Sequence, residues 1–197
     1  GLEFINVVIR KEGSDKIFKG SITDTDGRFT IPDVPDGNYT LTASSIGYKD
    51  ATRMFSLTEA APIKNFTAIY IVEDAKSLGE VVVTAQRSDM KLEVDRKSFS
   101  VDQQIANAGG AASDVLENIP SVEVDNDGNI SLRGNSSVEV WINGKSSGLT
   151  ADNRANILQQ LPAESIERIE VIDNPSSKFS AEGSAGIINI VLKKNLK

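Results

Sequence analysis

The sequence predicts an all-β sandwich followed by an α+β domain. Up to about residue 72, apolar and polar residues alternate in short runs separated by turn signals, which is typical of half-buried strands. From about residue 88, two short amphipathic helical patterns lie among further strand patterns. The polar stretch between these blocks reads as a linker. We therefore predict a sandwich over residues 1–72, a linker over 73–89 and an α+β domain over 90–197.

Strands in the first block are predicted from period-two alternation. Tyr39, Leu41 and Ala43 alternate with polar residues and are expected to face the core. A second inward set is predicted at Phe66, Ala68, Tyr70 and Val72. Turn signals rich in Gly, Asp and Asn recur at residues 24–27, 35–38 and 46–48. Residues 2–9 already read as a strand, so we expect the chain to begin inside a domain.

Helices and strands alternate in the second block. One helical stripe ends at Pro120 and another at Pro162, with apolar residues at Ala112, Val115, Leu116 and Ile119, and at Ile157, Leu158 and Leu161. Strand patterns cover residues 122–124, 130–133, 138–142, 166–172 and 186–192. The last pattern is almost wholly apolar, which predicts a central strand. Trp141, the single tryptophan, is expected to pack in the core.

Composition excludes several classes of protein. Hydrophobic residues make up 39% and charged residues 25%, as in a soluble globular protein. The net charge of -7 repels phosphate backbones, so nucleic acid is not an expected partner. The chain has no cysteine for a disulfide or thiolate metal site, and no apolar run reaches the roughly 18 residues of a membrane-spanning helix.

Catalytic and metal-binding motifs fail on chemistry. Residues 144–148 (GKSSG) have the spacing of a nucleophile elbow, but the chain has no histidine to activate Ser146. The acidic turns before Gly27 and Gly128 resemble fragments of a calcium loop, yet the twelfth positions hold Asp33 and Gly134 instead of glutamate. We expect ordinary turns at both, no cofactor and no metal, and we do not expect an enzyme.

Residues 78–85 (LGEVVVTA) form a short β-prone peptide inside the predicted linker. Three consecutive valines are β-branched and favour the extended state, so pairing with the open sheet edge of a partner would cost little further ordering. Strand addition of this kind is one reading. An ordinary edge strand is the other, and the peptide alone leaves both open.

Ordered motifs in the second block resemble the plug domain of TonB-dependent outer-membrane receptors. They are found at residues 119–124 (IPSVEV), 127–134 (DGNISLRG), 138–144 (VEVWING), 161–172 (LPAESIERIEVI) and 183–192 (GSAGIINIVL). The first block resembles a carboxypeptidase regulatory-like domain, a transthyretin-like sandwich found before the plug in receptors of the Bacteroidetes type. Residues 24–31 (DTDGRFTI) and 37–41 (GNYTL) carry that likeness, and the usual first strand is expected to be missing.

The resemblance implies a location and a set of partners. The chain would form the plug and periplasmic sandwich of an outer-membrane transporter in a Gram-negative bacterium, gating uptake of a nutrient such as a siderophore, glycan or peptide. Its partners would be the carboxy-terminal domain of TonB and the receptor's own carboxy-terminal β-barrel, which is absent from this sequence. Residues 78–85 resemble a TonB box, whose binding residues would be Glu80, Val81, Val82, Val83, Thr84 and Ala85.

Charged residues within the predicted strands are the remaining candidates. Charges inside a strand are costly unless they meet partners, so we expect these residues to pair with one another or with the barrel wall. Exposed salt bridges of little energetic value are the simpler alternative. A different class, a periplasmic or surface scaffold or adhesion module without transport, also stays open. The candidates for motif and barrel contacts are Arg133, Gly134, Glu167, Arg168 and Glu170.

Overall fold

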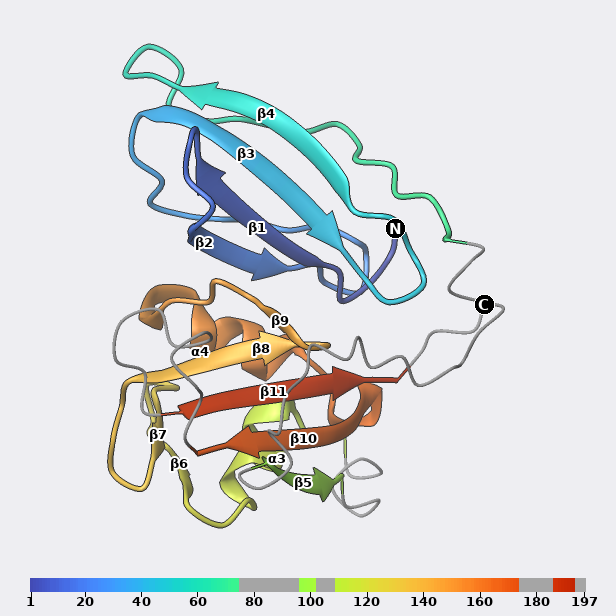
Figure 1. Ribbon diagram of the computed structural model, residues 1–197, viewed down its shortest axis with the longest axis vertical. Coiled ribbons are helices and arrows are strands. Elements are labelled where there is room, and N and C mark those ends of the chain that lie inside the picture. The colour runs from blue at the N-terminus through green and yellow to red at the C-terminus, as the bar shows by residue number, and fades with distance from the viewer. Residues whose placement is uncertain (75–95, 102–108, 174–185, 194–197) are drawn as a thin grey trace. The chain divides into compact units, whose positions relative to one another are not determined.

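The computed structural model describes residues 1–74, 96–101, 109–173 and 186–193 (Figure 1). The chain divides into two compact units, Gly1–Lys91 and Leu92–Lys197. The predicted linker segment, residues 78–85, lies outside the described residues. None of the helices within the described ranges is long and apolar enough to cross a membrane.

The first unit is built on a four-stranded antiparallel sheet in the order β2-β1-β3-β4 (Figure 1). Its strands are β1 (Asn6–Lys11), β2 (Ile17–Ile22), β3 (Gly37–Ser44) and β4 (Ala51–Leu57). The inward set predicted for β3 is confirmed, because Tyr39, Leu41 and Ala43 are only 2%, 1% and 4% exposed. The first strand begins later than predicted, since Phe4 turns the chain with a φ of 56°.

A second layer of chain covers one face of this sheet and makes the unit sandwich-like. Phe29, Ile31 and Val34 come from one covering segment, and Phe66, Ile69 and Ile71 come from another; all pack against the buried strand residues. The Phe55 ring stacks on Tyr39 at 5.5 Å between centroids and meets Phe66 edge-on at the same separation. The aromatic rings therefore join the two layers.

The inward set predicted at residues 66–72 is wrong after its first member. The chain bends at Thr67, and this bend shifts the alternation by one residue. Ile69 and Ile71 consequently pack on the core, where the prediction had placed their neighbours. The misassigned residues are instead exposed: Ala68, Tyr70 at 79% and Val72 at 64%.

The second unit contains a five-stranded mixed sheet in the order β5-β10-β11-β8-β9. The strands are β5 (Arg96–Ser100), β8 (Val138–Ile142), β9 (Lys145–Ser146), β10 (Ile166–Ile172) and β11 (Gly186–Leu192). The apolar strand β11 is central, as predicted, and pairs parallel to β8 and antiparallel to β10. Every residue of β11 is buried, which is why its sequence lacks the usual polar alternation.

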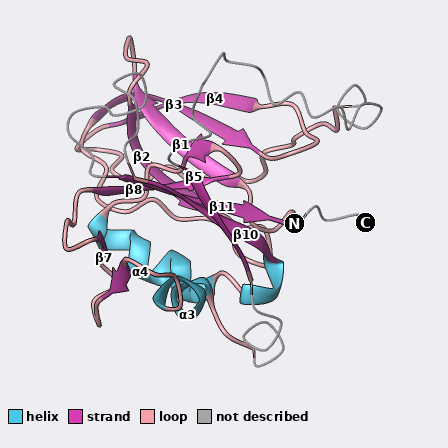
Figure 2. Cartoon of the chain, turned by 60° about the horizontal axis from the view of Figure 1, so that its bottom comes forward, coloured by secondary structure: helices cyan, strands magenta, loops and turns pink. Residues whose placement is uncertain are grey.

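Helices cover one face of this sheet (Figure 2). They are α3 (Ala112–Glu117), α4 (Ala151–Gln160) and a 3₁₀ turn, η1 (Ala163–Ser165), with a small antiparallel pair formed by β6 (Val122–Val124) and β7 (Ile130–Leu132). The stripe predicted on α3 is confirmed, with Val115 and Leu116 buried. The α4 helix starts well before its apolar stripe, because Asn153 Oδ1 accepts a hydrogen bond from the Thr150 N–H at 3.0 Å.

Candidate functional site

A row of polar residues crosses the five-stranded sheet on one face. Strand register places Ser98 opposite Glu170, Glu170 opposite Asn189, and Asn189 opposite Trp141. Successive side chains of a strand point to opposite faces, so Ile169 and Ile188 point the other way. Both are 0% exposed. The sheet thus has one apolar face and one face with a continuous polar row.

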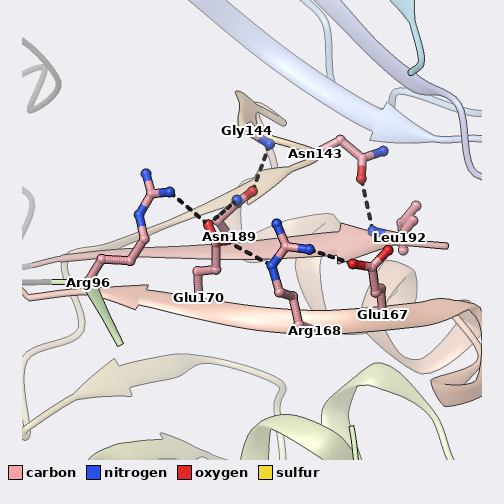
Figure 3. Close-up of polar contacts among 8 residues, drawn as sticks. All are labelled: Arg96, Asn143, Gly144, Glu167, Arg168, Glu170, Asn189 and Leu192. Carbon is pink, nitrogen blue, oxygen red and sulfur yellow. Dashed lines mark hydrogen bonds and ion pairs between the residues drawn. The ribbon is translucent and has the colours of Figure 1, made fainter. Parts of the chain in front are cut away.

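Asn189 is the centre of this row, and its side chain is fixed at both ends (Figure 3). Its Nδ2 donates to Glu170 Oε2 at 3.0 Å, and its Oδ1 accepts the Gly144 N–H at 2.8 Å. Only 5% of the residue is exposed, so water could not readily replace these two hydrogen bonds if they were lost. Asn189 therefore ties β11 to β10 on one side and to the end of β8 on the other.

The turn that meets Asn189 is specified by an Asn-Gly pair. Asn143 and Gly144 have φ values of 52° and 78°, the positive values that a two-residue hairpin turn requires. Ile142 and Lys145 pair directly on either side of the turn. Asn143 Oδ1 also accepts the Leu192 N–H at 2.9 Å. The turn is consequently bonded to β11 at two positions, Asn189 and Leu192.

Glu170 is a nearly buried carboxylate surrounded by cations. Arg168 Nε donates to its Oε1 at 3.0 Å, and Arg96 Nη1 lies 3.5 Å from its Oε2 (Figure 3). Arg168 also pairs with Glu167. Burial alone would raise the pKa of Glu170, but the hydrogen bonds from Asn189 and Arg168 and the charges of Arg96 and Arg168 together outweigh it. The pKa of Glu170 is held below its usual range.

This lowered pKa predicts acid sensitivity of the second unit. A carboxylate with a lowered pKa stabilises the fold fully above the pKa of an unfolded glutamate, about 4.3, and this stabilisation disappears as the pH falls through the folded-state pKa. We expect the urea midpoint of unfolding, followed by Trp141 fluorescence, to fall below about pH 4.3. Glu170→Gln should flatten that decline, whereas Glu123→Gln, at an exposed position, should not. An unchanged decline in Glu170→Gln would contradict the assignment.

Asp173 is a second shared acid, directly after β10. Its Oδ2 lies 2.8 Å from Arg133 Nη2 and 3.3 Å from Lys97 Nζ, and its side chain is 12% exposed. Arg133 follows β7, and its backbone N–H donates to Ser121 O at 2.9 Å. Arg133 and Gly134 have positive φ values of 52° and 79°. Asp173 therefore connects the β6–β7 pair, β5 and β10.

The predicted candidates fall into two neighbouring groups. Glu167, Arg168 and Glu170 form one cluster on β10, whereas Arg133 and Gly134 belong to the turn that reaches Asp173. Sequence reasoning missed the remaining members of the network: Arg96, Lys97, Asn143, Asp173 and Asn189. Two of them carried a recognisable signal: Asn189 is the single polar residue within the apolar run of β11, and Asn143 begins an Asn-Gly pair.

Two other expectations concern single residues and turns. Trp141 is not a core residue; it is half-buried in the polar row, and its indole Nε1 donates to Glu139 Oε2 at 2.9 Å. Asp24 Oδ1 and Asp125 Oδ1 each accept two backbone N–H groups within their own turns. These bonds account for the acidic turns as structural features. Among the described residues, no group of three or more potential metal ligands lies together.

Family comparisons divide the chain in two. Residues 1–83 match the CarboxypepD_reg-like domain, and residues 90–187 match the TonB-dependent receptor plug domain. The second match contains Glu170 and Asp173, and it ends two residues before Asn189. The predicted box lies outside the described residues; Glu80 to Val83 end the first match, and Thr84 and Ala85 lie between the two matches.

Individual proteins are similar over part of the chain. The rhizobactin receptor of Rhizobium meliloti (strain 1021) is 31% identical over 133 residues, which is 62% of this chain and 18% of that protein. The structure of a ferric enterobactin receptor of Pseudomonas aeruginosa aligns with 51% of this chain, which is 17% of the receptor chain. The identity is 21% and the TM-score is 0.40. The siderophore receptor PirA of Acinetobacter baumannii has 20% identity, the same coverage and the same TM-score. The chain thus spans less than a fifth of each.

Proposed function

Because this chain consists of a CarboxypepD_reg-like domain followed by a TonB-dependent receptor plug domain, we propose that it is the plug-bearing part of a TonB-dependent outer-membrane transporter. The plug gates energy-coupled uptake of a nutrient, and the first domain lies in the periplasm. The family match over residues 90–187 carries this proposal. The named function of the Rhizobium relative favours a siderophore over a glycan or a peptide as the nutrient. Membership of the Bacteroidetes type stays a prediction.

The polar row suits a domain that fills a polar lumen. A sheet face in contact with lipid or with an apolar partner would carry apolar side chains, whereas this face carries an internally bonded polar network. Arg133 and Glu167 pair within the plug, yet their side chains remain 59% and 51% exposed. We propose that these exposed charged atoms, with Arg168, contact the wall of the receptor's β-barrel. Because these charges already pair inside the plug, contact with the barrel wall would not bury an unpaired charge.

Energy coupling is assigned to the segment Glu80 to Ala85. The valines of this segment favour an extended backbone that can add to the sheet edge of the TonB carboxy-terminal domain. A periplasmic or surface scaffold without transport is the alternative function. The scaffold would use its sandwich for binding and would not need this segment.

Calorimetry with the carboxy-terminal domain of the same organism's TonB separates the two functions. Replacing Val81, Val82 and Val83 by proline removes the backbone donors that strand addition requires, so we expect at least a roughly tenfold loss of affinity. A matched variant places the three prolines at Ala75, Lys76 and Ser77 instead. This control should bind like the unchanged chain. Absence of binding by the unchanged chain, or equal binding by both variants, would favour the scaffold.

A further inference from the structure

The edge strand β5 is held to the sheet with little apolar contact. Among the described residues it pairs with β10 alone, over the five positions Arg96 to Ser100, and no other described strand lies on its other side. Phe99 is its one partly buried residue, and the other four are exposed. By contrast, every residue of the central strand β11 is buried. Apolar burial, the dominant stabilising term in folding, therefore contributes much less to holding β5 than to holding β11.

Two ion pairs supplement the backbone ladder at one end of β5. Arg96 Nη1 lies 3.5 Å from Glu170 Oε2, and Lys97 Nζ lies 3.3 Å from Asp173 Oδ2. Arg96 and Lys97 are the first two residues of the strand. The charged contacts thus stand where the chain enters the sheet. Within the described part of the chain, the rest of β5 is held by ladder hydrogen bonds and the Phe99 side chain.

Both acids keep a second cation that does not belong to β5. Glu170 also binds Arg168 at 3.0 Å and Asn189 at 3.0 Å, and Asp173 also binds Arg133 at 2.8 Å. The acid side chains are only 7% and 12% exposed. A poorly exposed carboxylate that loses its last partner is strongly destabilising. If β5 detached, Glu170 would keep Arg168 and Asn189. Asp173 would keep Arg133, so neither acid would lose its last partner.

From this double pairing we propose that β5 is a releasable strand, which detaches from β10 while β10, β11, β8 and β9 stay paired. The shared acids lower the cost of release and preserve the charges that receive Arg96 and Lys97 again when the strand returns. The use of this release rests on the proposed function: a pull delivered by TonB to the chain before Arg96 would act on the charged end of β5 first. The release itself is a property of the isolated chain.

Native-state hydrogen exchange of the whole 197-residue chain, without TonB, tests the release. We expect β5 amides to exchange at least about tenfold faster than β11 amides and with little dependence on low urea, because local opening exposes little surface. Protection of β11 serves as the internal measure that the plug is folded. Equal exchange and equal urea dependence of the two strands would show a single cooperative unit and overturn the proposal. The proposal would also be overturned if the β5 amides showed no protection from exchange while the β11 amides were protected.

Two variants at Asp173 give opposite predictions. Lys97→Gln removes the cation that leaves with β5, so exchange of β5 should become about two- to fivefold faster. Arg133→Gln removes the cation that stays, so Asp173 depends on Lys97 alone and exchange of β5 should become slower by a similar factor. Arg53→Gln on β4, an exposed arginine in the other unit, should change nothing. Faster exchange in Arg133→Gln would overturn the role of the second cation.

These outcomes are independent of the TonB experiment. Loss of the proposed energy coupling would appear as absent TonB binding with β5 release intact. Failure of the release proposal would appear as cooperative exchange with TonB binding intact.

Discussion

Ile188→Ala is expected to lower the free energy of unfolding of the plug domain by about 2–5 kcal/mol. Ile188 is 0% exposed and lies in the central strand β11, where paired strands flank it on both sides and limit collapse around a cavity. The lost transfer energy and the cavity both contribute to the cost. Urea unfolding followed by Trp141 fluorescence measures it, since the single tryptophan of the chain belongs to the plug.

The control for this variant is Ile63→Ala. Ile63 is 75% exposed, so its truncation should change stability by less than about 0.5 kcal/mol. An Ile188→Ala variant with an unchanged Trp141 transition would contradict the placement of β11 at the centre of the sheet.

Tyr39→Ala is expected to cost the first domain about 3–5 kcal/mol. Tyr39 is 2% exposed, its ring lies 5.7 Å from that of Phe18 and 5.5 Å from that of Phe55, and its hydroxyl donates to Pro35 O at 2.9 Å. Truncation removes both the aromatic contacts of Tyr39 with two other strands of its sheet and this hydrogen bond. Scanning calorimetry should show one transition at a lower temperature, without a change in the Trp141 transition, because each unit has its own core.

Tyr39→Phe separates the two contributions. This variant keeps the ring and loses only the hydroxyl, so the cost should be about 0.5–1.5 kcal/mol. Equal losses in Tyr39→Phe and Tyr39→Ala would mean that the ring contacts contribute little, contrary to the packing around Phe18 and Phe55.

Burial patterns made most of the plug sheet predictable from sequence. The runs at residues 166–172 and 186–192 became β10 and β11. The second run is apolar nearly throughout because β11 is buried on both faces. The α3 stripe was equally clear. Strand β5 could not be found this way, since Phe99 is its one partly buried residue and a single apolar residue sets no period. Its place depends on long-range pairing with β10.

The failed expectations have local causes. One bend at Thr67 reversed the faces of the residues that follow, and period-two patterns cannot register such a shift in advance. The polar network could be predicted only in part for a related reason. Glu167, Arg168 and Glu170 lie together in sequence, but Arg96 and Asn189 reach Glu170 from the separate strands β5 and β11. Pairing among distant charges is a property of the fold and is not visible in any one segment.

Asn189 also protects the plug against misassembly. An almost uniformly apolar strand can slide along its neighbours during folding and still bury apolar groups, so hydrophobicity alone distinguishes the competing alignments of β11 poorly. Only the native alignment gives Asn189 both Glu170 and the Gly144 N–H as partners. A slip would leave the buried amide of Asn189 without these two partners. This single amide thus favours the native alignment of the sheet over the others. Chains that lack it should populate misaligned, aggregation-prone states.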